Sequence, residues 1–248
     1  MKRITKILIM SLCFLPLLGS CRSNKGTNVS DQSSESVDTH NTNNSSGTQS
    51  QIVNVLSDEE RSLLSLVDNY EISKSYGYDY SVIQYVDSVV TNSHKVSIRI
   101  NEDFCKAKKV EYTKKLNYGD SDSQFSETTF TTYFNNGKLV KDNESTTITL
   151  EDFAKCNISE FDLIQKAQIM DDLTLVKSGI YNILSFNVSE SNSKNFLGIT
   201  SSVKKLKVEI KVNQDLSKLV SFKISYNQDL SSTCIEFSAN YESSNIDI

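Results

Sequence analysis

The 248-residue sequence is short of the residues that most enzymes use. It holds one proline, no tryptophan and two histidines, His40 and His94. Proline removes a hydrogen bond from a β-ladder, so its absence after Pro16 is compatible with long uninterrupted strands. No pair of histidines is available for a zinc site, and a Ser-His-Asp or Cys-His arrangement would depend on His94 alone. His94 follows Thr91, Asn92 and Ser93 in what we expect to be an exposed turn.

Motifs for common catalytic chemistry are missing as well. The sequence contains no glycine-rich phosphate loop, no nucleophile elbow and no Cys-x-x-Cys pair. Two acidic turns, Asp120-Ser121-Asp122 and Asp171-Asp172, lack the full frame of a calcium loop, and we interpret them as solvated carboxylates. We therefore expect a protein that is not an enzyme and has no metal or cofactor.

The charge balance argues against nucleic-acid binding. The chain has 26 basic and 31 acidic residues, and loss of Lys2, Arg3 and Lys6 with an N-terminal signal would leave 23 against 31, or a net charge of −8. Proteins that bind nucleic acids gain most of their affinity from cationic contacts with phosphate. We expect no nucleic acid as a partner.

A local stripe of lysines contrasts with this acidic balance. It is interrupted by Glu209 and consists of Lys204, Lys205, Lys207 and Lys211. Such a stripe is either the solvated face of a strand or a surface that faces an anionic polymer or lipid head groups.

The first residues have the three parts of an export signal: a basic start, an apolar run over Ile7–Leu18, and a small-residue exit. The run is shorter than the roughly 20 apolar residues of a membrane-spanning helix. Pro16 interrupts the helix just before the exit. We therefore predict a signal peptide over residues 1–20.

The four residues Leu18-Gly19-Ser20-Cys21 resemble the Leu-small-small-Cys motif of bacterial lipoprotein signals at every position. The resemblance implies cleavage before Cys21 and attachment of diacylglycerol and fatty acyl chains, such as palmitate, to that residue. Two or three acyl chains hold a protein durably at a membrane. The expected location is a bacterial membrane, with the protein facing outside the cytoplasm. The alternative is an ordinary secretory signal in which Cys21 is incidental.

Residues 21–55 are rich in Ser, Asn, Thr, Asp and Gln and hold few apolar residues, so they are expected to form a disordered tether. Residues 56–248 are expected to form a single β-rich domain. Three cysteines remain in that domain, Cys105, Cys156 and Cys234. An odd number cannot all pair internally, so either one disulfide or three thiols is expected.

The domain opens with a helix and continues with strands. Ser57 and Glu60 form a capping box that predicts a helix over about 58–69. Apolar residues then alternate with polar ones, which is typical of half-buried antiparallel strands. Such runs are predicted at 96–100, 110–112, 173–176, 181–188, 206–212, 220–226 and 235–241. Turns are predicted at 118–122, at Asn136-Gly137 and at 213–215, and helical turns at 149–154 and 159–164.

This order of elements resembles the LolA-like half-barrel found in bacterial lipoprotein carriers and related lipoproteins. The hairpin over 133–140 and the closing strands over 204–241 carry the resemblance. It implies an α+β, mainly β fold, in which an antiparallel curved sheet packs its concave face on an N-terminal helix and short helical breaks. Such a face can enclose a hydrophobic ligand. A β-sandwich is the alternative.

Six apolar side chains are candidates for lining such a cavity: Val110, Tyr112, Phe222, Tyr226, Phe237 and Tyr241. They form either a cavity for an acyl chain or a core that is packed shut. The sequence therefore predicts a monomeric, non-enzymatic lipoprotein that binds a hydrophobic ligand or an envelope component. The alternative is a structural or host-facing interaction lipoprotein with a packed core and no small ligand.

Overall fold

The structure is a computed structural model that describes residues 56–118, 123–141 and 144–248. The predicted signal peptide, Cys21 and the predicted tether lie outside these residues. None of the helices in the described ranges is long and apolar enough to cross a membrane.

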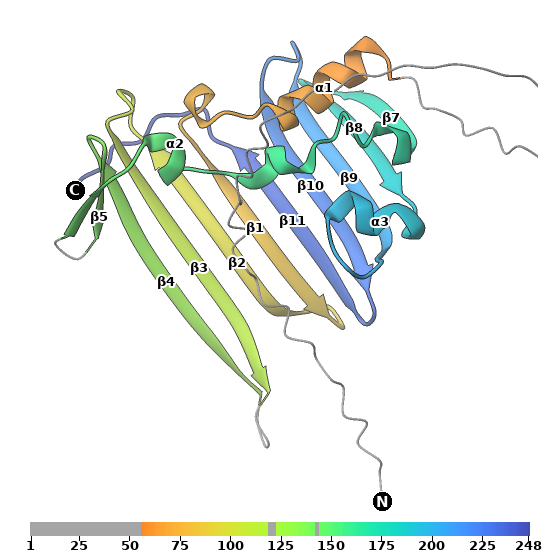
Figure 1. Cartoon of the computed structure of the whole chain (residues 1–248), viewed down its shortest axis with the longest axis horizontal. Helices are drawn as coiled ribbons and strands as arrows, with labels where there is room; N and C mark the ends of the chain where they lie inside the picture. The colour runs from red at the N-terminus through yellow and green to blue at the C-terminus, as the bar shows by residue number, and fades with distance from the viewer. Residues whose placement is uncertain (1–55, 119–122, 142–143) are drawn as a thin grey trace, which may run out of the picture. The chain divides into compact units, whose positions relative to one another are not determined.

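The described strands form one antiparallel sheet in the order β6-β5-β4-β3-β2-β1-β11-β10-β9-β8-β7, shown in Figure 1. Adjacent strands of this sheet are consecutive in the sequence except at the centre, where β1 pairs with β11, and the consecutive strands β6 and β7 lie at opposite edges. The strands are β1 Gly77–Val86, β2 Val89–Ile100, β3 Lys106–Tyr118, β4 Ser123–Asn135, β5 Lys138–Lys141, β6 Glu144–Thr147, β7 Asp171–Ser178, β8 Tyr181–Val188, β9 Lys204–Asn213, β10 Leu219–Gln228 and β11 Ser231–Ala239.

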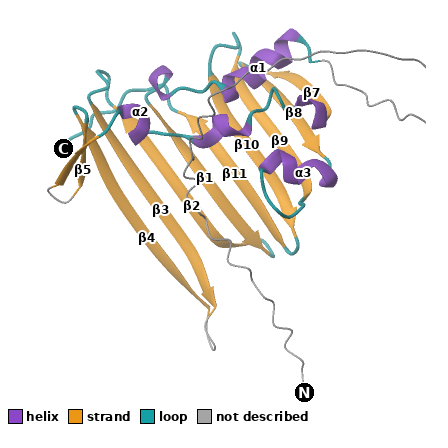
Figure 2. Cartoon of the chain, in the orientation of Figure 1, coloured by secondary structure: helices purple, strands orange, loops and turns teal. Residues whose placement is uncertain are grey.

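The described helices lie on one face of this sheet, as Figure 2 shows. They are α1 Asp58–Asp68, η1 Ile72–Lys74, α2 Leu150–Phe153, η2 Asn157–Phe161, η3 Ala167–Ile169 and α3 Glu190–Leu197. Helix α1 contacts β9 and β10, and α3 contacts β8 and β9. We call the face that carries the helices the inner face and the opposite one the outer face.

The capping box at the start of α1 is confirmed. The Ser57 hydroxyl accepts a hydrogen bond from the Glu60 backbone N–H, and the Glu60 carboxylate accepts one from the Ser57 N–H at 2.8 Å. The helix then buries Leu63, Leu64 and Val67 completely. The capping box therefore fixes the start of α1, and the amphipathic spacing fixes the side that it turns toward the sheet.

The inner face of β8 to β11 forms most of the core. The alternating apolar residues of β9, from Leu206 to Val212, are all buried there. Aromatic rings fill the space between sheet and helices: Phe161 lies 5.2 Å from Phe222 and 6.3 Å from Phe196, measured between ring centroids. These contacts connect η2, β10 and α3 in one packed layer.

Gly77, where β1 begins, has a backbone requirement of its own. Its φ is +133°, and a Cβ atom at this position would lie 2.1 Å from the Ile98 carbonyl oxygen. Only glycine permits this close approach of β1 to β2.

The predicted fold class is confirmed: the domain is α+β and mainly β, with one open, curved antiparallel sheet and few helices. The β-sandwich alternative is wrong, because all described strands belong to a single sheet, and helices rather than a second sheet lie on its inner face.

Several local predictions also hold. Asn136 and Gly137 turn β4 into β5 with φ values of 46° and 79°, as the Asn-Gly signal requires. The turn at 213–215 joins β9 to β10, and Thr149 caps α2. The second helical turn is η2, which begins at Asn157 rather than at 159. The core of the turn predicted at 118–122 lies outside the described residues.

The turn predicted around His94 is wrong. Residues 91–94 lie within β2, and the chain reverses earlier, at Asp87 and Ser88, which have φ values of 49° and 66°. Asn92 and His94 lie on the inner face of β2, and Ser93 between them lies on the outer face. The described helices do not cover β2 along its whole length (Figure 1). Polar side chains are therefore tolerated on the inner face of this strand.

Candidate functional site

Phe222 and Phe237, two of the six candidate cavity residues, lie in the packed core. Both are fully buried on the inner face and directly opposite each other on β10 and β11. The Phe222 ring contacts Phe161, and the Phe237 ring lies 4.8 Å from Tyr70 and 5.5 Å from Tyr78. Protein side chains occupy the space beside these two rings.

Val110 and Tyr112 do not join them, which corrects the expectation that they share the core-facing side. The register places Lys109 opposite the buried Ile98, so Lys109 is on the inner face and its neighbour Val110 is on the outer face. Tyr112, two residues further, is also on the outer face. The sequence predicts the alternation of β3 correctly, but the apolar side chains of this strand face away from the core.

Tyr226 and Tyr241 occupy the remaining two positions. Tyr226 pairs with Thr233 at the end of β10, and burial raises the pKa of its phenol above the ordinary value. Tyr241 follows β11, donates a hydrogen bond to the Leu219 carbonyl at 2.7 Å and lies under the Lys218 ammonium group. The six residues are therefore divided between two faces and do not line one cavity.

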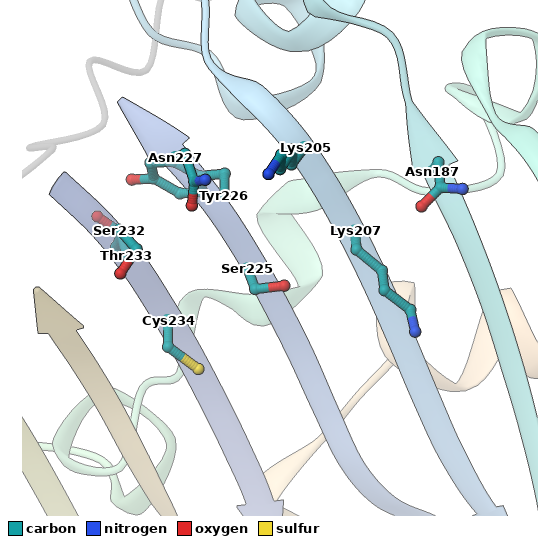
Figure 3. A pocket seen from close by; sticks show the side chains of 9 residues that line it. All are labelled: Asn187, Lys205, Lys207, Ser225, Tyr226, Asn227, Ser232, Thr233 and Cys234. Atoms are coloured by element: carbon teal, nitrogen blue, oxygen red, sulfur yellow. The ribbon is translucent and has the colours of Figure 1, made fainter. Parts of the chain in front are cut away.

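A pocket of about 520 Å³ lies where β8, β9, β10 and β11 run side by side (Figure 3). We call it the first pocket. Nine residues from these four strands line it: Asn187, Lys205, Lys207, Ser225, Tyr226, Asn227, Ser232, Thr233 and Cys234. Most are amides, hydroxyls and ammonium groups, which exchange hydrogen bonds with polar ligands.

A β-bulge shapes this pocket. Ser225 pairs with Lys207 and Asn227 pairs with Lys204, so Lys205 and Leu206 together oppose the single residue Tyr226. Lys205 takes a left-handed backbone conformation with φ of 53°. Bulges redirect side chains beside functional sites, and this one leaves Leu206 in the core while Lys205 lines the pocket beside Lys207.

A smaller pocket of about 250 Å³ lies on the outer face of β1, β2 and β3, and we call it the second pocket. Its lining residues are Ile83, Val90, Ser93, Lys95, Tyr112 and Lys114. A bulge lies here too, since Gln84 pairs with Asn92 and Tyr85 with Val90.

Ser93 is the unusual member of the second pocket. Its side chain is 4% exposed, and its hydroxyl oxygen is the only buried side-chain polar atom of the described residues that has no hydrogen-bond partner. An unpaired buried hydroxyl costs about 1–3 kcal/mol. The hydroxyl lines a pocket, so a bound polar group can satisfy it.

The acidic side chains of the outer face are largely committed to partners. Glu236 pairs with Lys223, whose pKa is raised by that contact, and Glu209 lies opposite Lys223 on the other side. Glu127 pairs with Lys114 at 2.8 Å. By contrast, none of the described carboxylates forms an ion pair with Lys95, Lys205 or Lys207.

The three domain cysteines form no disulfide with one another, and each is half-buried. Burial raises the pKa of the Cys234 thiol, with Glu236 as a further cause. Cys234 is therefore mostly protonated at neutral pH and is a poor nucleophile.

No protein-family model matches the chain, and no curated protein sequence matches it. Among solved structures, the lipoprotein LppX of Mycobacterium tuberculosis is similar over 76% of this chain and 96% of its own, at 18% sequence identity and a TM-score of 0.33. We infer neither the fold nor a function of this chain from LppX at this level of similarity. The fold class given above is based on the strand order of the sheet.

Proposed function

We propose that this chain is a lipid-anchored, non-enzymatic lipoprotein that faces outside the cytoplasm of a bacterium and presents a β-sheet domain to an envelope component. The observation that carries the proposal is the motif Leu18-Gly19-Ser20-Cys21 directly after a basic start and an apolar run. In this proposal Cys21 is the acylated N-terminus of the mature protein, and residues 21–55 space the domain from the membrane.

Binding at the surface of the domain is favoured over an enclosed acyl-chain site. Phe222 and Phe237 are packed against other rings, and the first pocket is lined mostly by residues with amide, hydroxyl or ammonium groups. A carrier for a buried apolar ligand needs an apolar cavity. The packed core supports an interaction protein whose partner is recognised by the sheet.

A hydrophobic ligand remains the second candidate because one part of the inner face is apolar and only half-buried. Tyr80, Val96 and Ile235 lie there beside the fully buried core. Binding of a fluorescent fatty acid to the purified chain, reversed by Tyr80→Ser, would favour this second candidate.

The anchor is tested by expressing the wild-type chain and Cys21→Ala in a bacterium supplied with an alkyne-tagged fatty acid. The wild-type chain is expected to take up the label and to sediment with membranes. Cys21→Ala is expected to lose the label and to keep the mass of the precursor. Cys105→Ala, which alters a cysteine of the folded domain, is the matched control and should behave as wild type. Equal labelling of all three proteins would refute the anchor.

A further inference from the structure

The two pockets adjoin on the outer face. Cys234, which lines the first pocket, and Ile83, which lines the second, are directly paired residues of β11 and β1. Ser93 pairs in turn with Ile83 and with Lys114. One row of paired residues therefore runs across six strands, consisting of Lys207, Ser225, Cys234, Ile83, Ser93 and Lys114.

This row, together with the lining residues of the two pockets that lie on the outer face, defines what we call the outer groove. Neighbouring strands are about 4.8 Å apart, so five steps from β9 to β3 span about 24 Å. That length exceeds a single small molecule and fits several units of an extended polymer. The groove runs across the strands rather than along them.

The charge of the groove is positive on a chain that is acidic as a whole. Lys205 and Lys207 at one end, and Lys95 at the other, have no ion-pair partner among the described carboxylates. Local positive charge on an acidic protein selects for anionic ligands and speeds their association. These three lysines, without ion-pair partners and at the two ends of the groove, match a polymeric ligand whose negative charges repeat along its length.

Hydroxyl recognition is the second property of the groove. Asn227, Ser225 and Ser232 line the first pocket, and Ser93 offers a buried hydroxyl in the second. Amides and hydroxyls both donate and accept hydrogen bonds, as sugar hydroxyls do. A ligand that carries both negative groups and hydroxyls would satisfy all of these side chains.

We propose that the outer groove binds an extended anionic glycan, whose phosphate or carboxylate groups pair with Lys205, Lys207 and Lys95 and whose hydroxyls reach Ser93. This inference rests on the proposed binding function and names its partner, but it does not depend on the lipid on Cys21. A glycan of this class belongs to the space outside the cytoplasm in which the proposed function places the domain.

An anionic bilayer fits the groove less well. The hairpin tips that flank the two pockets carry Asp87 and Asp229, whose exposed side chains would meet lipid phosphates first. Nucleic acid fits less well because its bases bind by stacking on aromatic side chains, and Tyr112 and Tyr226 are the only aromatic residues among those that line the two pockets.

The test is a binding titration of the full chain in non-ionic detergent. The probes are a glycerol-phosphate oligomer and an oligogalacturonate, each long enough to span the groove, with maltoheptaose as the neutral probe. The anionic oligomers are expected to bind and maltoheptaose is not. Added salt should weaken the binding, because screening reduces the attraction between exposed charges.

The decisive variants are Lys205→Gln combined with Lys207→Gln, and the matched control Lys211→Gln combined with Lys218→Gln. The control removes the same charge, but Lys211 lies over the Tyr181 ring and Lys218 over the Tyr241 ring, outside the groove. The groove variant is expected to raise the Kd at least about tenfold, which corresponds to the loss of one or two hydrogen bonds to charged groups. The control variant should stay close to wild type.

Ser93→Ala separates a binding role from a structural one. Removing an unpaired buried hydroxyl should leave the stability of the chain unchanged or raise it, while the affinity for the anionic oligomers falls. Equal affinities of groove and control variants would overturn the proposal. So would tighter binding of phosphatidylglycerol vesicles or of single-stranded DNA than of either oligomer. If the wild-type chain takes up the fatty-acid label at Cys21 but binds neither anionic oligomer, this inference is overturned and the proposed anchor is unaffected.

Discussion

Asp68 and Leu163, 95 residues apart in the sequence, are joined by a hydrogen bond from the Leu163 backbone N–H to the Asp68 carboxylate at 2.7 Å. The second carboxylate oxygen accepts another from the Ile164 N–H at 2.9 Å. Asp68 ends α1, and the two donors follow η2. One side chain therefore holds the N-terminal helix to the central helical segment over the core.

Asp68→Ala should destabilise the domain by about 1–3 kcal/mol, because two partly buried backbone donors lose their acceptor. Chemical denaturation measures the change. Asp79→Ala is the matched control: it removes an exposed ion pair with Arg99, which is worth about 0–1 kcal/mol. Equal losses in the two variants would contradict the role of Asp68.

Gly77→Ala should be among the most damaging single substitutions in the sheet. The new Cβ would meet the Ile98 carbonyl oxygen at 2.1 Å, so β1 and β2 would have to separate. We expect a loss of about 3 kcal/mol or more, or failure to fold. Gly179→Ala also replaces a glycine with positive φ, but its Cβ would meet nothing within 4 Å, and about 1 kcal/mol is expected. Thermal denaturation compares the two, and similar melting temperatures would contradict the close approach at Gly77.

Tyr80 should make the free energy of unfolding fall at alkaline pH. Burial raises the pKa of its phenol to about 12, whereas an unfolded tyrosine has a pKa of about 10. The protonated phenol therefore stabilises the fold fully below pH 10, and this contribution is lost as the pH rises toward 12.

The test compares the wild-type chain with Tyr80→Phe by chemical denaturation at pH 9 and at pH 11. The wild-type chain should lose about 1 kcal/mol more than the variant over this interval, because phenylalanine has no proton to release. Equal losses would mean that the Tyr80 phenol is not buried.

Two valines test which face of the sheet is the core. Val208 is fully buried on β9, whereas Val110 is half-buried on the outer face of β3. Val208→Ala should cost about 2 kcal/mol or more through the cavity it leaves, and Val110→Ala less than about 1 kcal/mol. A larger loss for Val110→Ala, measured by denaturation, would reverse the face assignment.

Local signals in the sequence were sufficient for α1, for the Asn136-Gly137 hairpin and for the alternation of β9, since each depends on residues close together in the chain. Helix α3 was missed, although Ser189 at its N-cap and Gly198 at its C-terminal end, with φ of 67°, mark its limits. Its apolar periodicity is weak because Phe196 is its one large buried side chain.

The faces of β3 could not be predicted from alternation. Period two separates Lys109 from Val110, but only pairing with β2 decides which of them faces the helices. Beyond Ala107 and Phe134, which pack beneath α2, the described helices leave this part of the inner face open. Polar residues are therefore tolerated there, and the outer face can hold Val110 and Tyr112.

The outer groove was only partly foreseeable. The lysines of β9 were visible as a stripe, and an anionic polymer was one interpretation of them. The pairing of β1 with β11, which brings residues of the first pocket beside those of the second, joins opposite ends of the domain sequence. The unpaired hydroxyl of Ser93 was not foreseeable either, because its burial depends on the pairing of β2 with β1 and β3.

The mass of the N-terminal peptide of the protein extracted from membranes tests the central proposal most directly. The proposal predicts a peptide that begins at Cys21 and carries a diacylglyceryl group, with no trace of residues 1–20. An unmodified peptide that begins at any other residue, or a chain that retains residues 1–20, would contradict it.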